Sequence, residues 1–288
     1  MSSVPLVSTA AVGRFVGVAG TLVFERLSAI PKLAGVTPAS RLEVRPTPLM
    51  VSSGVREVDA LTGGLPRGCL TEICGPASSG RTSVLLAALA AATQRQEVCA
   101  LVDISDAFNP HSAAAAGVNF ERLLWVRCGG NKQKVRSPQR HRAIEKTEKN
   151  ENARRQIEKP VEQALQVTDL LLRSGGFGLV IIDLGNTPVK MARRIPLASW
   201  FRFQRAVEHT ATVLFVISQA PCAQTCASLL LKVSGKSLSA VSSQLSAETP
   251  PAHAQLLHGL QVQGELLRSR LERKPAGSVT TTFTTKVG

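Results

Sequence analysis

Short apolar runs recur along the chain from Val51 onward, separated by longer stretches in which apolar and polar residues are mixed. Within the runs, apolar and polar positions do not alternate. This pattern is typical of strands that are buried on both faces of a parallel sheet. The predicted strands are residues 70–74, 98–102, 123–126, 179–182, 213–217 and 228–233.

The stretches between these runs include three predicted helices, at residues 82–94, 160–173 and 196–209. The first is rich in alanine and leucine, which favour helix. Pro160 is expected to begin the second and Gly175 to follow its end, in keeping with the preferences of helix termini. Strands that alternate with helices predict an α/β fold, with a twisted, mostly parallel central sheet flanked by helices.

The same pattern divides the chain into three parts. Residues 1–48 have no strong period and contain several prolines, so we expect an N-terminal segment and linker there. Residues 49–245 carry the alternating pattern and form the predicted core. Residues 246–288 favour a C-terminal β extension, with two strands joined across residues 274–277.

One segment interrupts the core pattern. Residues 131–159 contain ten Lys and Arg, four Glu and almost nothing apolar, so this insertion must be solvated. Glu145 and Lys149 are spaced for an exposed helix. Both a surface tether and a nucleic-acid contact arm are compatible with this charge pattern.

The whole chain is strongly basic, with 34 Lys and Arg against 20 Asp and Glu and a formal net charge of +14. An excess of one sign indicates an acidic partner, and nucleic acid is the commonest, so we expect single-stranded DNA to bind by charge. A membrane surface, or no polyanion at all, are the alternatives. The apolar stretch at residues 15–24 is too short to span a bilayer, and we expect no membrane partner.

The six cysteines are scattered, and several lie within apolar runs. This distribution argues against a disulfide framework and favours a reducing, cytoplasmic location. Cys222 and Cys226 have no nearby second pair or histidine, so no zinc site is expected.

A glycine-rich loop follows the first predicted strand and opens the first predicted helix. Glycines at both ends of such a loop let its N–H groups point inward, and the helix N-terminus adds positive potential for a phosphate. A purely structural turn is the alternative. The residues predicted to bind the phosphates of ATP are Gly75, Pro76, Ala77, Ser78, Ser79, Gly80, Arg81, Thr82 and Ser83.

Two side chains of this loop and one from a later strand bear on the chemistry of the predicted site. Thr82 is placed to reach a Mg²⁺ ion, and Asp183 ends an apolar strand where a second magnesium-side carboxylate is expected. An aspartate at a strand end is also often a cap or turn residue. Arg81 occupies the position of the usual lysine and keeps its charge, but its planar fork is bulkier than an ammonium group.

These features occur in an order that resembles the RecA recombinase family. Gln219 lies where that family carries a glutamine that senses the γ-phosphate. The resemblance implies a RecA-like fold, ATP and Mg²⁺ as cofactors, an ATP contact from Asn109, and a homo-oligomer. The similar segments are residues 51–61, 63–68, 71–80, 102–110, 117–124, 162–165 and 172–175.

The chain departs from the family pattern at catalytic positions. Ser105 aligns with the catalytic glutamate, and Ser112 with the tyrosine that stacks on adenine. Asp106 is a candidate replacement for the glutamate, although neighbouring residues at a strand end point in different directions. Loss of a general base costs about 10²–10⁴ in rate, so we expect weak or absent ATP hydrolysis.

The expected DNA-binding segments also differ from those of recombinases. The stretch after Asp183 is shorter, and its basic residues Lys190, Arg193 and Arg194 are predicted to contact DNA phosphates. The stretch after Gln219 lacks the family's glycine-rich loop. We therefore expect phosphate contact without recombinase-style strand pairing.

A RecA-like core with altered catalytic residues resembles the bacterial ImuA group, which accompanies mutagenic translesion polymerases. This resemblance implies a role in DNA repair and SOS damage tolerance, with RecA or a translesion polymerase as partner. Two alternatives stay open. One is an active DNA-dependent ATPase or recombinase; the other is a non-catalytic interaction protein that resembles RecA-related cell-division inhibitors.

Overall fold

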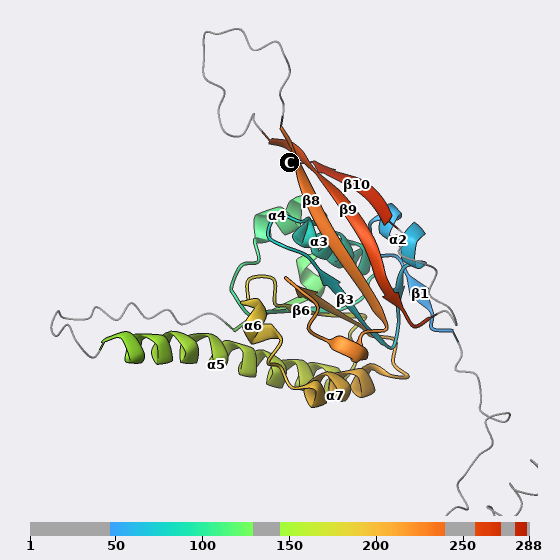
Figure 1. Ribbon diagram of the computed structural model, residues 1–288. Helices are drawn as coiled ribbons and strands as arrows, with labels where there is room; N and C mark the ends of the chain where they lie inside the picture. The colour runs from blue at the N-terminus through green and yellow to red at the C-terminus, as the bar shows by residue number, and fades with distance from the viewer. Residues whose placement is uncertain (1–46, 129–144, 240–256, 272–279, 287–288) are drawn as a thin grey trace, which may run out of the picture. The chain divides into compact units, whose positions relative to one another are not determined.

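An eight-stranded sheet organises the part of the chain that the computed structural model describes, residues 47–128, 145–239, 257–271 and 280–286 (Figure 1). Its strands follow the order β10 (Thr280–Lys286), β9 (Leu257–Ser269), β8 (Leu229–Ser239), β3 (Cys69–Cys74), β7 (Val213–Ser218), β6 (Leu179–Asp183), β4 (Cys99–Asp103) and β5 (Leu123–Arg127). Neighbours from β8 to β5 are parallel, whereas β9 pairs antiparallel with β8 and β10. The α/β fold with a mostly parallel central sheet is confirmed.

Every strand predicted from the apolar runs is present. β8 continues several residues further than predicted, and β9 and β10 are the two strands predicted near the C-terminus. They extend the central sheet beyond β8, with β10 at its edge. The predicted boundary at residue 245 and the segment 1–46 lie outside the described residues, so the division into core and extension stays a prediction. A small sheet of β1 (Met50–Val51) and β2 (Leu65–Pro66) was not predicted.

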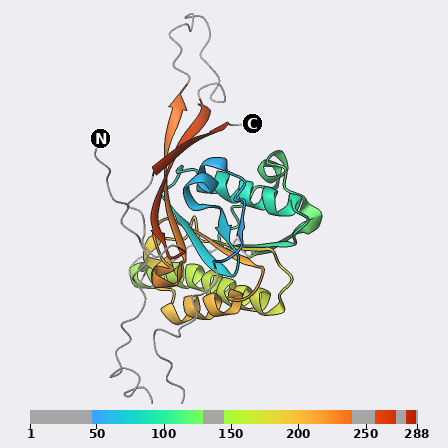
Figure 2. The same cartoon turned by 90° about the vertical axis from the view of Figure 1, so that its right-hand side faces the viewer.

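Helices cover both faces of this sheet (Figure 2). They are α2 (Arg56–Thr62), α3 (Arg81–Gln94), α4 (Pro110–Ala115), α5 (Glu145–Ser174), α6 (Val189–Ala192) and α7 (Leu197–Val207). Along β7, Phe215 and Ile217 pack in the core cluster of α2 and α3, while Leu214 and Val216 pack in that of α5 and α7. Burial on both faces therefore explains why the strand sequences are continuously apolar.

Pro160 does not begin a helix, which corrects the prediction from the sequence. α5 starts at Glu145 and continues through Pro160 to Ser174. A proline inside a helix removes one backbone hydrogen bond and is usually excluded, so a start at this residue was the natural expectation. Residues 145–159 are rich in Glu, Lys and Arg, which favour helix. Residues 131–144 of the predicted insertion lie outside the described residues, and the insertion's role stays a prediction.

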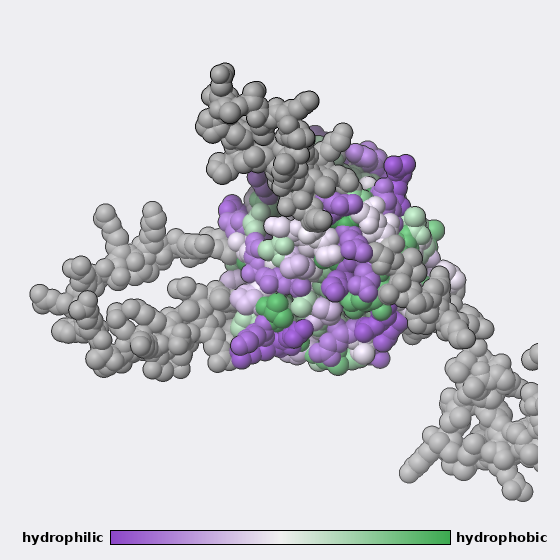
Figure 3. All heavy atoms as spheres, turned by 45° about the horizontal axis from the view of Figure 1, so that its top comes forward, coloured by the Kyte–Doolittle hydropathy of each residue, from purple (hydrophilic) through white to green (hydrophobic). Residues whose placement is uncertain are grey.

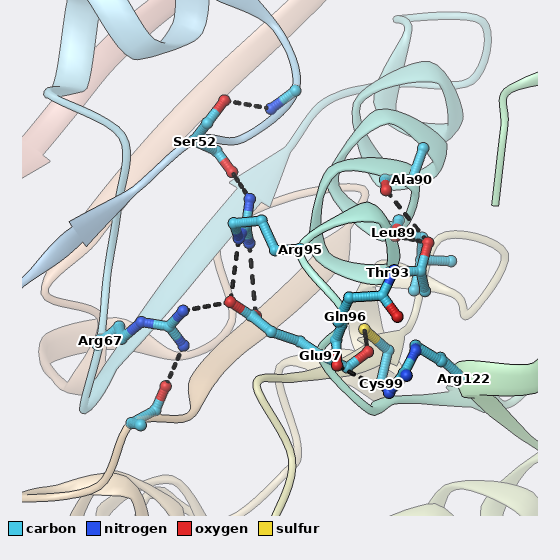
Figure 4. A network of polar contacts seen from close by, with 12 residues as sticks. Ser52, Arg67, Leu89, Ala90, Thr93, Arg95, Gln96, Glu97, Cys99 and Arg122 are labelled. Atoms are coloured by element: carbon cyan, nitrogen blue, oxygen red, sulfur yellow. Dashed lines mark hydrogen bonds and ion pairs between the residues drawn. The ribbon is translucent and has the colours of Figure 1, made fainter. Parts of the chain in front are cut away.

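A cluster of charged residues joins the amino ends of the parallel strands (Figure 4). Glu97, just before β4, accepts hydrogen bonds from Arg67, just before β3, and from Arg95, whose Nε lies 3.0 Å from Glu97 Oε1. Arg67 also donates to the carbonyl of Ala211, just before β7, and Arg95 to that of Ser52, at 3.2 Å. We call Arg67, Arg95 and Glu97 the strand-start clamp. It lies at the opposite end of the sheet from the loop after β3.

The molecular face drawn in Figure 3 carries hydrophobic residues in small patches among hydrophilic ones. The large apolar side chains that are exposed belong to several different elements; they are Leu49, Val98, Phe120, Leu124, Leu170, Phe201 and Leu267. Within the described segments, no helix combines the length and apolar character needed to cross a membrane.

Candidate nucleotide and DNA site

The loop between β3 and α3 makes a tight turn at the carboxyl end of the sheet. Ser78 has φ 56° and Gly80 has φ 88°, both in the left-handed region. A Cβ atom on Gly75 would lie 2.2 Å from the carbonyl oxygen of Val233, and one on Gly80 would lie 2.4 Å from Cγ2 of Val262. β8 and β9 therefore press against the two ends of the loop, where only glycine fits.

The inner groups of this loop are available as hydrogen-bond donors. The N–H groups of residues 77–80 donate to no atom of the described chain, and Gly80 gives α3 no side-chain cap. Ser79 is only 1% exposed, yet its Oγ has no hydrogen-bond partner among the described residues. Unpaired amides at the head of a helix are the arrangement that binds phosphate. The loop can thus receive an anion without breaking an existing hydrogen bond.

Arg81, the first residue of α3, points toward the turn that follows β6. Arg81 is only 8% exposed, and its Nη1 donates a hydrogen bond to the carbonyl oxygen of Gly185 at 3.1 Å. Burial lowers the pKa of Arg81, while the negative charge of Asp183 opposes that shift. The guanidinium group therefore connects the loop between β3 and α3 to the end of β6.

Asp183 ends β6 and lies in register with Asp103 at the end of β4. Its Oδ1 accepts a hydrogen bond from the Gly185 amide at 2.7 Å. Burial raises the pKa of Asp183; the Gly185 amide opposes this shift, Asp103 adds to it, and Arg81 opposes it. Asp103 is occupied elsewhere: it accepts from the amides of residues 105, 107 and 108 and from Trp125 Nε1.

The surroundings of Asp183 do not fit the predicted magnesium site. Mg²⁺ requires near-octahedral oxygen ligands at short distance. One Asp183 oxygen already accepts a backbone amide, and the Arg81 guanidinium lies at the same turn. A divalent cation here would be placed beside a fixed positive charge. Thr82 is exposed at the head of α3 and remains able to reach a ligand. The described residues contain no group of three or more His, Cys, Asp or Glu side chains that could hold a metal ion.

Gln219, just after β7, contacts the same turn as Arg81. Its Nε2 donates to the carbonyl oxygen of Thr187 at 3.3 Å, two residues beyond the carbonyl that Arg81 holds. The hydroxyl of Thr187 is buried and has no hydrogen-bond partner among the described residues. The structure thus brings Arg81, Asp183 and Gln219, which are far apart in sequence, to one turn at residues 183–187.

The other predicted polar residues are engaged within the chain. The carboxylate of Asp106 accepts two hydrogen bonds of 2.6 Å from Arg127, on the edge strand β5. Asn109 is the N-cap of α4, where its Oδ1 accepts from the amides of His111, at 2.9 Å, and Ser112, at 3.3 Å. Their roles as catalytic base and ATP ligand stay predictions.

Comparisons with known proteins show the family to which this fold belongs. A family model described as the RecA N-terminal domain matches residues 29–136. Protein RecA of Kineococcus radiotolerans is 30% identical over 211 residues, which cover 67% of this chain and 52% of that protein. The chain belongs to the RecA family.

Further RecA proteins show similar levels of identity. Protein RecA of Salinispora tropica is 29% identical, with 67% of this chain and 52% of that protein covered. Protein RecA of Psychrobacter cryohalolentis is 34% identical over 136 residues, which are 46% of this chain and 30% of that protein. The chain spans about half the length of the first two RecA proteins.

The predicted DNA-binding residues of this RecA family member follow the turn at 183–187 directly. Lys190 lies on α6, and Arg193 and Arg194 follow it. All three are exposed, and none forms an ion pair with a carboxylate in the described part of the chain. They form a compact positive surface, which we call the α6 basic segment.

Glu72 is a site residue whose role the sequence did not suggest. It is fully buried on β3, where it accepts hydrogen bonds from Ser218 Oγ at 3.0 Å and from the amides of Cys222, at 2.7 Å, and Ala223, at 3.1 Å. The carboxylate therefore fixes the segment after β7, next to Gln219. A charged residue within an apolar strand was the available signal, because such residues are rarely buried without partners.

Proposed function

We propose that this RecA family member is a DNA-repair protein that binds ATP at residues 75–83, binds single-stranded DNA by charge, and hydrolyses ATP weakly or not at all. The observation that carries this proposal is the loop itself, with unpaired amides at residues 77–80 and the buried, unpartnered Ser79 hydroxyl. Membership of the RecA family supports ATP as the ligand.

The proposed ATP contacts divide between backbone and side chains. The amides of residues 77–80 and the first turn of α3, including Thr82 and Ser83, face the phosphates, since a helix N-terminus attracts negative charge. Arg81 contributes a positive charge at the base of the loop, and Gln219 holds the turn at 183–187, where a γ-phosphate sensor is expected.

Weak hydrolysis follows from the lack of a suitable base. A serine at position 105 cannot take a proton from water as a carboxylate does. Asp106 is adjacent, but Arg127 engages both of its carboxylate oxygens. An ion-paired carboxylate is a poorer base, because the arginine stabilises its charged form.

DNA binding is supported by the exposed charge. The formal net charge of +14 favours association with any polyanion, and the α6 basic segment provides unpaired cations that are exposed. Such contacts attach the protein to phosphates without reading sequence.

A finer proposal concerns the pathway in which the chain acts. A RecA-like core that binds nucleotide and DNA but turns over poorly suits an accessory protein of translesion synthesis in the SOS response, with a polymerase or RecA as its partner. Self-association into a homo-oligomer belongs to the same proposal, as does a cytoplasmic location.

The ATP half of the proposal is tested by titrating a fluorescent ATP analogue into the full chain, with phosphate release followed in the presence and absence of single-stranded DNA. We expect saturable binding, a loss of about tenfold in affinity for Arg81→Ala, equivalent to roughly 1.4 kcal/mol, and at most slow phosphate release. Arg173→Ala, on α5, is the matched control and should bind normally. Rapid DNA-stimulated release would favour the active ATPase, and no binding would favour the pure interaction protein.

The DNA half is tested by fluorescence anisotropy with labelled single-stranded DNA at several salt concentrations. Alanine at Lys190, Arg193 and Arg194 should lower the salt slope by about 2, since each phosphate contact on a single strand contributes roughly 0.7. The control carries alanine at Arg173, Arg202 and Arg205, which removes the same charge from α5 and α7. Equal slopes for the two triple variants would show that only net charge matters.

A further inference from the structure

We propose that Arg81 is the resident cation of Asp183, and that the loop at residues 75–83 therefore binds nucleotide without needing Mg²⁺. The nucleotide part of this inference rests on the proposed function. The pairing of Arg81 with Asp183 does not, and it is tested separately.

The geometry of Gly185 places the two charged groups at one turn, although they are too far apart to form an ion pair within 4.0 Å. A Cβ atom built on this glycine would lie 2.8 Å from Asp183 Oδ1 and 3.4 Å from Arg81 Nη1. Both side chains therefore face the same point of the turn. The glycine backbone also links them, because its amide donates to Asp183 and its carbonyl accepts from Arg81.

Arg81 supplies the positive charge that this turn requires. Asp183 is largely buried beside Asp103, and two neighbouring carboxylates need compensation in a low-dielectric setting. The charge of Asp103 is met by three backbone amides and an indole N–H. Among the described residues, Arg81 is the cation that acts on Asp183.

The position of Arg81 also lets it serve a phosphate. It is the first residue of α3 and directly follows the loop whose amides are unpaired. A guanidinium group carries five N–H donors, so a bond from Nη1 to Gly185 leaves others for a phosphate oxygen. Together with the helix N-terminus, this charge offsets the phosphates where a divalent ion would otherwise do so.

The pairing of Arg81 with Asp183 is tested without nucleotide, by thermal unfolding of the full chain in EDTA and in 10 mM Mg²⁺. This concentration is about 10-fold above the dissociation constants of the weakest typical divalent-ion sites. The wild-type melting temperature should be the same in both buffers. Arg81→Ala should lower it by at least about 3 °C, and a second change, Asp183→Asn, should restore most of that loss. Mg²⁺ should also raise the melting temperature of Arg81→Ala.

Two results would overturn the pairing. One is a wild-type protein that Mg²⁺ stabilises as much as it stabilises Arg81→Ala. The other is strictly additive effects of Arg81→Ala and Asp183→Asn, because residues that share a charge interaction are not additive. If Arg81→Ala folds poorly, the melting temperature of Asp183→Asn alone still tests the pairing, because this change removes the negative charge and keeps the shape of the side chain.

The nucleotide part is tested by titrating the fluorescent ATP analogue in EDTA and in Mg²⁺. The dissociation constants of the wild-type protein in the two buffers should agree within about twofold. Arg81→Lys has a compact ammonium group in place of the planar guanidinium, so it should bind the analogue at least about tenfold more tightly with Mg²⁺ than in EDTA. Wild-type binding that needs Mg²⁺ contradicts the inference. Absence of binding in both buffers defeats the proposed function and the magnesium-independent binding with it, while the unfolding data still decide the pairing.

Discussion

Ser79 places a buried hydroxyl in the loop between β3 and α3, where it has no hydrogen-bond partner among the described residues. Such a group is destabilising, because it loses its bonds to water on folding and gains none in return. The tight contact of Gly75 with Val233 and Ser79 keeps the loop in this arrangement. A side chain that costs stability at a candidate site is best explained by a bond made only when ligand is present.

Ser79→Ala should therefore stabilise the ligand-free protein and weaken ligand binding. We expect the free energy of unfolding in urea to rise by about 1 kcal/mol, and the affinity for the ATP analogue to fall. Ser218→Ala is the matched control, because its hydroxyl donates to Glu72 and its loss should lower stability. A Ser79→Ala protein that is less stable than wild type would contradict this prediction.

The strand-start clamp shows how a few charges order an entire set of elements. Glu97 receives hydrogen bonds from both arginines, and these in turn donate to the carbonyl of the residue after β1 and to one in the segment before β7. Burial alone would raise the pKa of Glu97, but the hydrogen bonds and charges of Arg95 and Arg67 outweigh burial and hold it below its ordinary value. The clamp thus stabilises the sheet only while Glu97 is charged.

Glu97→Gln should destabilise the protein at neutral pH by about 2 kcal/mol, the range of hydrogen bonds to charged groups. Because the pKa is lower in the folded state, the wild-type advantage is complete above the ordinary value of 4.5 and disappears as the pH falls through the folded value. Urea unfolding from pH 7 to pH 3 measures it. Glu162 on α5 is exposed, so Glu162→Gln should have the same free energy of unfolding as wild type at every pH. A difference between wild type and Glu97→Gln that stays constant at all pH values would refute the role of charge.

In the whole molecule, one sheet joins two apolar clusters on its opposite faces. The first includes Phe283 of β10 and contacts Trp125, and the second contains Trp200 of α7. Both clusters draw side chains from the same strands, so neither can form without the sheet. The described residues from Pro48 on belong to one compact unit.

Phe283→Ala should therefore weaken both clusters together. Removing a buried phenylalanine side chain costs about 3–5 kcal/mol. Unfolding is followed by the fluorescence of Trp125 alone in a Trp200→Phe background, and of Trp200 alone in a Trp125→Phe background. The unfolding midpoint should shift by the same amount with both probes. Thr282→Ala, on the exposed side of the same strand, should leave both midpoints in place. A shift seen only through Trp125 would show that the two faces unfold independently.

Much of this architecture could be predicted from the sequence, because burial on both faces leaves a local record. Every strand from β3 to β8 appears as an apolar run, and the phosphate loop appears in the spacing of its glycines. The start of α5 was missed, since the rule for Pro160 is local while the helix continues through it. The two-residue strands β1 and β2 are too short to produce a pattern.

The chemistry of the candidate site depended on contacts that no local pattern contains. The bond from Arg81 to Gly185 joins residues 104 positions apart. No local pattern indicates that Arg81 points toward Asp183, so Arg81 was predicted to act on phosphate and Asp183 on a metal ion, each separately. The pattern near the C-terminus predicted two strands, but not that Val262 packs on Gly80.

The packing of Val262 on Gly80 has a consequence for the order in which the protein is made. The ribosome completes the loop between β3 and α3 long before the strand that supports it, since 182 positions separate Gly80 from Val262 (262 − 80). Until then, nothing backs the nascent loop on that side. The loop therefore reaches its final packing only after β9 has been translated and has paired with β8.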